Sequence, residues 1–302
     1  FRYTRDNKSV FIPITFGSHF SRLSKRFKNC YWCFKSYDLR YMAIFKANSI
    51  LVKRAGRLAI FRKEHRLRRE MFRKSFRDKK AFIFLLIRQA YFFCRPFMKK
   101  RPIWLFFDKI YKGGDSSEYI YKYACAQDDN IDKYYLIDKK ATDYKRLKKE
   151  GYKPLKRGSI KHRLIFLYSD MIIASNSTLM EFNDYSMATS SYVRDLINYD
   201  AVCVQHGMSI QKIAIAQNRL RDNIKLYFCA SPYEIENLNR PVYDYEGRDI
   251  LKLTGVPRYD GLKDRHKKQI MISPTWRMQA ALAPKGNEGV ERDYNPLFKE
   301  TD

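Results

Sequence analysis

The stretch IWLFFDKIYKGGDSSEYIYKYACA, residues 103–126, contains a short apolar run, a pair of glycines and a helical pattern. The run at 103–107 has the length and the aromatic and branched content of a buried strand. Asp115 and Glu118 have the spacing of a capping box, a pair of side chains that bonds backbone N–H groups at a helix start. The stretch therefore predicts a strand, a tight turn and a helix in succession.

The same alternation continues along the chain. Further apolar runs lie at 134–137, 171–174, 201–204, 226–230, 251–254 and 269–273, and helical patterns lie between most of them, at 144–150, 160–168 and 211–220. Strands that alternate with helices predict an α/β protein with a Rossmann-type parallel sheet and right-handed crossovers. Ligands of such sheets bind at the carboxyl ends of the strands, so the residues after each run are site candidates.

The residues before this region have a different pattern. Residues 1–57 contain short strand-like runs at 9–15, 31–35 and 49–53. With 45% hydrophobic residues the chain can bury real cores, so these runs predict the end of a small β-rich module and not a disordered segment.

Residues 58–100 are helical in pattern and strongly basic. Ten Lys and Arg residues crowd positions 62–80, and an aromatic-rich block follows at 82–97. A basic helix beside an aromatic one suits an anionic membrane interface, and it equally suits a solvated face beside a helix packed on the core. The longest apolar run, 81–87, ends at Arg88 and is too short to span a membrane, so the sequence predicts a soluble or peripherally bound protein.

The overall charge demands an anionic partner. The net charge is +28, and nucleic acid, an acidic membrane surface and phosphate-rich substrates all meet that demand. Cys30 and Cys33 form a Cys-x-x-Cys pair, but no second pair completes a zinc site, so we expect neither a metal nor a cofactor. The chain starts at Phe1 without a signal-peptide pattern, and we expect it to be cut from a longer protein.

Gln205, His206 and Gly207 directly follow the run at 201–204. Imidazole near its ordinary pKa takes a proton from a hydroxyl at neutral pH, and glycine lets the chain turn sharply and a ligand approach. A histidine hydrogen-bonded within a loop has the same pattern. His206 is the candidate catalytic base, with Gln205 and Gly207 beside the substrate, whereas His162 is expected to be structural.

Phosphate-binding candidates follow other strands. The stretch Gly114-Asp115-Ser116 frees backbone N–H groups at a helix start, where phosphate binds well. Arg258 and Arg277, each just after an apolar run, can pair with a phosphate or a carboxylate. Plainer roles are a capped helix start, a Gly-Pro turn and a surface charge. No Walker or dinucleotide-binding glycine pattern is present.

Six motifs occur in order over residues 101–277. They are Ile103-Trp104-Leu105-Phe106-Phe107-Asp108, Gly114-Asp115-Ser116-Ser117-Glu118, Gly158-Ser159-Ile160-Lys161-His162, Gln205-His206-Gly207, Thr254-Gly255-Val256-Pro257-Arg258-Tyr259-Asp260 and Pro274-Thr275-Trp276-Arg277. Together the series resembles the CDP-glycerol:poly(glycerophosphate) glycerophosphotransferase family, the teichoic-acid primases and polymerases.

The resemblance implies a GT-B architecture, in which two Rossmann-like domains face each other across a cleft. Residues 101–265 would form the acceptor-side domain, and 266–302 the start of the donor-nucleotide domain. It also implies transfer of glycerol phosphate from CDP-glycerol to a hydroxyl of a polyprenyl-linked acceptor, with release of CMP, at the cytoplasmic face of the bacterial cell membrane. His206 matches the family histidine proposed as general base. Arg258 and Arg277 would hold the pyrophosphate.

Two departures qualify the resemblance. Asp115-Ser116 stands where the family usually has Asp-Asn, and the family's donor-site histidines lie beyond Arg277, where this chain has no histidine. We therefore expect 266–302 to be a truncated donor domain and the chain to be inactive alone. The alternatives are a GT-B glycosyltransferase that uses a nucleotide sugar, and a non-catalytic protein that binds nucleic acid or an anionic surface. No recognised nucleic-acid motif supports the last of these, so we expect no nucleic acid partner.

Overall fold

The computed structural model describes residues 2–5, 8–11, 31–36, 39–46, 49–98, 100–175, 192–197, 199–208, 217–219, 223–264 and 270. The chain divides into two compact units, residues 1–262 and 263–302. Every helix and strand in the described part belongs to the first unit. Arg277 and all of the run at 269–273 except Ile270 lie outside the described residues, so the second domain and its boundaries stay predictions.

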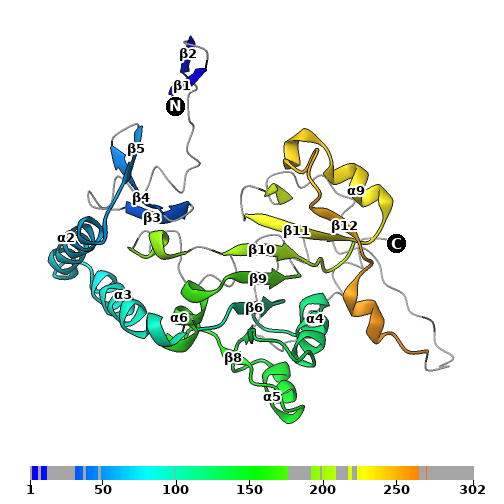
Figure 1. Cartoon of the computed structure of the whole chain (residues 1–302). Helices are drawn as coiled ribbons and strands as arrows, with labels where there is room; N and C mark the ends of the chain where they lie inside the picture. Colours follow the sequence, from blue (N-terminus) through cyan, green and yellow to red (C-terminus); the bar gives the residue numbers. More distant parts are fainter. Residues whose placement is uncertain are drawn as a thin grey trace, which may run out of the picture. The chain divides into compact units, whose positions relative to one another are not determined.

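Seven strands form one parallel sheet in the first unit (Figure 1). They are β6 (Ile103–Phe107), β7 (Asp132–Ile137), β8 (Leu155–Lys156), β9 (Met171–Ala174), β10 (Asp200–Cys203), β11 (Ile224–Cys229) and β12 (Leu251–Leu253). Their order across the sheet is β12-β11-β10-β9-β6-β7-β8, and every neighbouring pair is parallel. The chain adds β7 and β8 on one side of β6, and then adds β9, β10, β11 and β12 in turn on the other side. The predicted parallel α/β sheet is confirmed.

Helices cover both faces of this sheet, because alternate strand residues point to opposite sides. In β6, Phe106 packs on one face with α4 (Ser116–Cys125) and α5 (Thr142–Lys149). Leu105 and Phe107 pack on the other face with α3 (Lys79–Met98) and α6 (Ile160–Tyr168) (Figure 1). Shorter helical pieces are α9 (Pro232–Leu238), η2 (Arg194–Leu196), η3 (Pro241–Tyr243) and η4 (Pro257–Gly261).

Two antiparallel elements precede the helices. One is a hairpin of β1 (Arg2–Arg5) and β2 (Lys8–Phe11), and the other is a sheet of β3 (Tyr31–Ser36), β4 (Leu39–Lys46) and β5 (Ser49–Arg54). The strands predicted at 31–35 and 49–53 are confirmed. The run at 9–15 is described only as far as Phe11, and β4 was not predicted.

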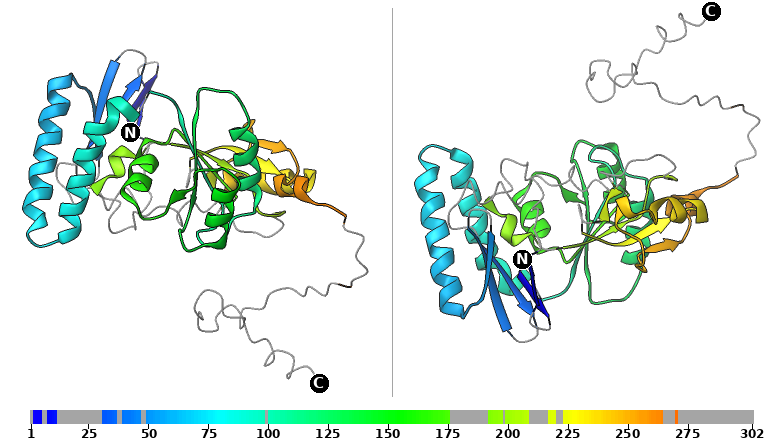
Figure 2. Two further views of the ribbon diagram at one scale, coloured as in Figure 1. Left: turned by 90° about the horizontal axis from the view of Figure 1, so that it is seen from below. Right: turned by 90° about the horizontal axis from the view of Figure 1, so that it is seen from above.

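The basic and aromatic segment folds as two helices, α2 (Arg57–Ser75) and α3, which lie side by side (Figure 2). The expectation that its apolar stretch is too short to span a membrane was wrong. Within the described part, α3 is the one helix long and apolar enough for that by length and composition. The helix continues through Arg88 to Met98 because the charge of Arg88 is neutralised inside the fold.

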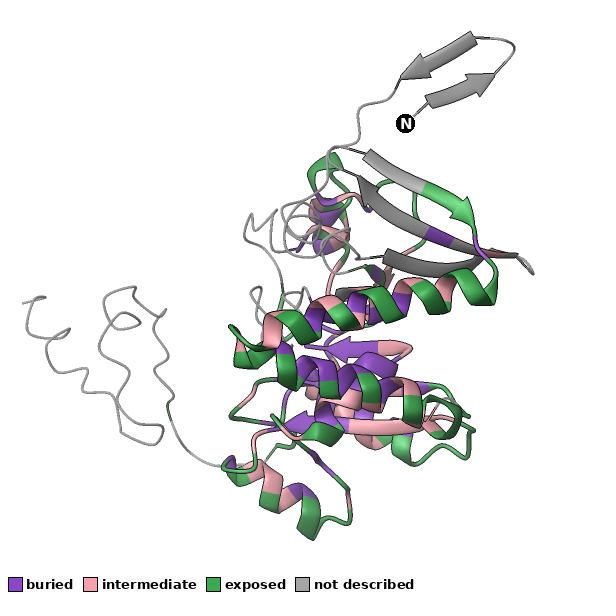
Figure 3. Cartoon of the chain, turned by 90° about the vertical axis from the view of Figure 1, so that its left-hand side faces the viewer, coloured by how far each residue is buried: buried purple, intermediate pink, exposed green. Residues whose placement is uncertain are grey.

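Arg88 is fully buried and is held by two carboxylates. Its Nη2 lies 2.6 Å from Glu64 Oε2 of α2 and 2.5 Å from Asp195 Oδ2 of η2. The guanidinium also donates through Nε to Glu64 and through Nη1 to Asp195, so both pairs are bidentate. The inner face of α3 is therefore tied to α2 and to η2, while its outer apolar residues remain exposed (Figure 3).

Candidate active site

The candidate residues gather where the chain reverses its direction of strand addition. β6 and β9 are neighbours in the sheet but are separated in sequence by β7 and β8, so their carboxyl ends form a topological switch point. Crevices of open α/β sheets lie at such points. Asp108 directly follows β6, Ser175 directly follows β9, and His206 follows the next strand, β10.

His206 projects from the turn after β10. Gln205, which precedes it, is buried and has a φ of 52°, a left-handed conformation that turns the chain sharply at this point. The imidazole is exposed, and its Nδ1 lies 3.2 Å from the backbone oxygen of Ser175. A carbonyl oxygen only accepts, so Nδ1 carries a proton, and in the neutral ring Nε2 then keeps its lone pair. This geometry suits the predicted base.

The turn before α4 uses its backbone N–H groups internally. Six consecutive N–H groups, from Gly113 to Glu118, all donate to side-chain carboxylates. The pairs are Gly113 to Asp143 at 2.9 Å, Gly114 to Glu118 at 2.7 Å, Ser116 to Asp115 at 2.9 Å, and Asp115, Ser117 and Glu118 to Asp108 at 3.3, 2.9 and 3.1 Å. The N–H groups that the sequence assigned to phosphate are thus already occupied by the chain's own carboxylates.

The predicted capping box is also replaced. The side chain of Asp115 accepts from the N–H of Ser116 and not of Glu118, and the side chain of Glu118 accepts from the N–H of Gly114 and not of Asp115. Asp108 caps the helix instead, because its carboxylate sits at the positive end of α4. Gly114 has a φ of 80°, which explains the glycine in this turn. The hydroxyl of Ser116 is buried and has no hydrogen-bond partner in the described part of the chain.

Asp108 is a buried group whose role the sequence analysis missed. Its Oδ2 accepts from the Tyr135 hydroxyl at 2.7 Å, in addition to the α4 N–H groups. Burial, reinforced by the neighbouring charge of Asp115, raises the pKa of Asp108 to about 6, although the donors around it favour the charged form. A polar residue directly after a buried strand was the available signal.

Arg258 lies in η4, which follows β12, and its side chain extends to the turn before α4. Its Nη1 lies 3.4 Å from Asp115 Oδ1, and its side chain stays partly exposed. η4 is held against α4 because Gly261 packs on the Tyr119 side chain, where a Cβ would collide with the ring and its hydroxyl. The structure thus brings Arg258 to the predicted 114–116 turn. The roles of these residues, and of Gln205 and Gly207, stay predictions.

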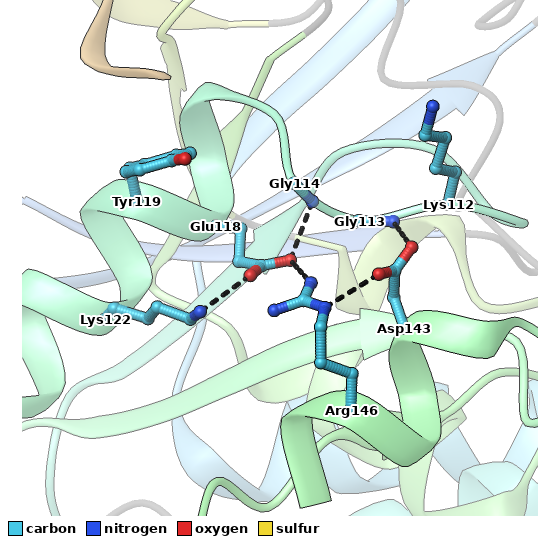
Figure 4. A pocket seen from close by; sticks show the side chains of 8 residues that line it. All are labelled: Lys112, Gly113, Gly114, Glu118, Tyr119, Lys122, Asp143 and Arg146. Carbon is cyan, nitrogen blue, oxygen red and sulfur yellow. Dashed lines mark hydrogen bonds and ion pairs between the residues drawn. The ribbon is translucent and has the colours of Figure 1, made fainter. Parts of the chain in front are cut away.

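A pocket with a volume of about 320 Å³ lies beside the turn (Figure 4). It is lined by Lys112, Gly113, Gly114, Glu118, Tyr119, Lys122, Asp143 and Arg146. Arg146 lies between two acids, 2.7 Å from Glu118 and 2.8 Å from Asp143. Lys112 forms no ion pair within the described ranges, and its charge helps to lower the pKa of Asp143 across the pocket. The described residues contain no cluster of acidic, histidine and cysteine side chains that could hold a metal ion.

This chain is similar to known proteins over most or all of its length. A sequence model described as CDP-Glycerol:Poly(glycerophosphate) glycerophosphotransferase matches residues 87–295. The minor teichoic acid biosynthesis protein GgaB of Bacillus subtilis (strain 168) is 30% identical over 306 residues, which cover 100% of this chain and 33% of GgaB. The chain therefore spans about a third of the length of this curated relative.

Among solved structures, a variant of the wall teichoic acid polymerase TagF soaked with CDPG shows a TM-score of 0.38 and 14% identity. That match covers 68% of this chain and 50% of the polymerase chain. The conclusion about kinship rests on the sequence match, which extends over most of the chain and includes the strand-end residues described above. The chain belongs to the CDP-glycerol:poly(glycerophosphate) glycerophosphotransferase family.

Proposed function

We propose that this chain supplies the acceptor side of a glycerophosphotransferase active site, with His206 as the general base. The observation that carries the proposal is the contact of His206 Nδ1 with the Ser175 carbonyl at the switch point of the sheet. It leaves Nε2 as a hydrogen-bond acceptor on an exposed ring, where a substrate hydroxyl can reach it. Membership of the family supports glycerophosphate transfer as the reaction in which this base takes part.

The proposed reaction is an in-line phosphoryl transfer. Nε2 of His206 takes the proton of an acceptor hydroxyl, and the acceptor oxygen attacks the β-phosphorus of CDP-glycerol. The bond from that phosphorus to the bridging oxygen breaks, and CMP leaves with the electron pair. The product is a phosphodiester between glycerol and the acceptor. Catalysis of this kind depends mainly on positioning and on neutralising charge.

The cationic side chains at the carboxyl edge are the proposed phosphate ligands. Arg258 is partly exposed beside Asp115, and Lys112 lines the neighbouring pocket. The stretch 114–116 then serves as a rigid wall, because its N–H groups are already donated to carboxylates. Arg277 remains proposed as a ligand of the donor pyrophosphate on sequence grounds alone, with Gln205 and Gly207 beside the substrate.

We further propose a polyprenyl-linked teichoic-acid acceptor at the cytoplasmic face of the bacterial membrane. The relative GgaB is named for teichoic acid biosynthesis. The positions of the basic residues also support a membrane. Four exposed arginines form one stripe of α2, at Arg62, Arg66, Arg69 and Arg73, and the exposed Arg77 follows the end of the helix. Exposed apolar side chains form a stripe of α3, at Ile83, Leu86, Phe93 and Phe97. Adjacent basic and apolar surfaces favour an anionic lipid interface over nucleic acid.

The test of this function is CMP release from CDP-glycerol by the intact protein. His206→Ala should lower the rate at least about a hundredfold, the usual contribution of a general base. His65→Ala, which removes an exposed histidine of α2, is the matched control and should leave the rate unchanged. A His206→Ala rate above about a tenth of the original argues against the base. Turnover of UDP-sugars in place of CDP-glycerol would favour a glycosyltransferase.

A further inference from the structure

Ser175 joins three parts of the candidate site. It is buried directly after β9, and its backbone N–H donates to the Phe107 carbonyl of β6 at 3.2 Å. Its hydroxyl acts on the Asp108 carboxyl as a donor that favours the charged form and so lowers the pKa of that group. Its own carbonyl accepts from His206 Nδ1 at 3.2 Å. One residue thus connects the end of β6 to the imidazole after β10.

The Asp108 carboxylate at the other end of this connection cannot turn. Two N–H groups of α4, from Ser117 and Glu118, and the Tyr135 hydroxyl of β7 all donate to it, at 2.9, 3.1 and 2.7 Å. Donors from two different elements fix both carboxylate oxygens. The Ser175 hydroxyl therefore meets an acceptor of fixed position, and the serine backbone is held with it.

The imidazole needs such a fixed partner. Neutral histidine in water favours the tautomer with the proton on Nε2, and the tautomer in a protein follows the hydrogen bond made by the other nitrogen. His206 is exposed, so water competes for its Nδ1 proton. A carbonyl that stays in place selects the Nδ1–H tautomer and aims Nε2 away from the sheet.

We propose that Asp108 and Ser175 are positioning residues, which hold His206 in the Nδ1–H tautomer through the Ser175 carbonyl. The inference rests on the proposed function of His206 as the base. In this proposal both residues act through His206 and not on the substrate itself. Asp108 also caps α4, so Ser175 is the residue at which positioning can be separated from helix capping: Ser175→Ala removes only the hydroxyl and leaves the backbone carbonyl and the cap.

The first test is the tautomer of His206, measured by long-range ¹H–¹⁵N NMR of the ring nitrogens of the chain. The His206 signals are assigned by their loss in His206→Gln. The wild-type ring should show the proton on Nδ1, and Ser175→Ala should shift the ring toward the Nε2–H form. Ser169→Ala is the matched control, because Ser169 is equally buried and its hydroxyl bonds Ile165 at 2.8 Å, within α6. It should leave the tautomer unchanged.

The second test is kinetic. Ser175→Ala in the intact protein should lower kcat by about tenfold to a hundredfold with KM unchanged, as expected for a misaimed base. Ser175→Thr, which keeps the hydroxyl, should restore most of the rate. A wild-type ring protonated on Nε2 overturns the proposal without any variant, and so does a Ser175→Ala protein with the original tautomer and kcat. If His206→Ala keeps its activity, the proposed function fails instead.

Discussion

Asp108 is a carboxyl group whose proton uptake changes on folding. Its pKa rises from an ordinary value of 3.8 to about 6 because the group is buried. Between these values the folded chain binds more protons at this site than the unfolded chain. The stabilisation from a protonated Asp108 is therefore fully present below about pH 4 and is lost as the pH rises through 6.

Asp108→Asn should reveal this linkage, because the variant cannot ionise. The free energy of unfolding of the wild type, minus that of the variant, should fall by up to about 3 kcal/mol between pH 4 and pH 7. Urea unfolding at several pH values measures both curves, and the difference cancels contributions from other groups. Two curves that run parallel over this range would show that the pKa of Asp108 is not raised.

Single-residue patterns predicted part of the candidate site. His206 and Arg258 were proposed because each directly follows an apolar run, and the parallel sheet brings Arg258 to the 114–116 turn. Ser175 and Asp108 were missed because their contribution depends on which strands are neighbours. The phosphate role of the turn N–H groups was predicted without knowing that Asp108, Glu118 and Asp143 already accept from them.

At the level of elements, the buried guanidinium of Arg88 joins α3 to α2 and η2. Arg88→Met would leave the buried Asp195 carboxylate without its cation and would leave Glu64 with only the partly exposed Arg68, at 2.6 Å. We expect the free energy of unfolding to fall by about 3–5 kcal/mol, the range for breaking a buried pair from one side. Chemical denaturation followed by circular dichroism is the measurement.

The triple variant Arg88→Met, Glu64→Gln, Asp195→Asn is the control for this prediction. It removes the charges of Arg88 and of both its partners together and leaves the partly exposed Arg68, so it should recover much of the lost stability. An Arg88→Met protein within about 1 kcal/mol of the wild type would mean that water or nearby cations already neutralise the two acids. The network would then be incidental to how α3 packs.

Element boundaries followed from the sequence where periodicity was strong. α6 and the strands around the site were predicted closely, because buried parallel strands are continuous apolar runs. The helical pattern at 58–100 was predicted, but its apolar stretch was ended at Arg88, since a charged residue interrupts an apolar run until its partners Glu64 and Asp195 are known. β4 was missed because the sequence at 39–46 mixes polar and apolar residues without a clear alternation.

At the level of the whole molecule, the net charge is +28, and α2 contributes to it with eight Lys and Arg residues against two Glu. The chain should sediment with vesicles that contain phosphatidylglycerol but not with pure phosphatidylcholine, and high salt should weaken the binding. Reversing Arg66, Arg69 and Arg73 to Glu should reduce partitioning on the order of a hundredfold or more, since each basic residue contributes about 1 kcal/mol.

The matched control reverses three exposed lysines of α5, Lys145, Lys148 and Lys149, with the same change of net charge. This variant should keep most of the vesicle binding, because its charges lie on a different helix. Equal losses in the two triple variants would mean that only the total charge matters. Equal binding of the wild type to both lipids would remove the electrostatic explanation.

The salt bridge between Arg258 and Asp115 spans 143 residues of sequence. During synthesis on the ribosome, the His206 turn therefore emerges well before the arginine that completes the charged edge. β12, which leads to Arg258, pairs with β11, so the edge is finished only when the last strand of the sheet docks. A nascent chain halted before residue 258 would carry the proposed base but lack this proposed phosphate ligand. Synthesis thus delivers the His206 turn first and the complete charged edge last.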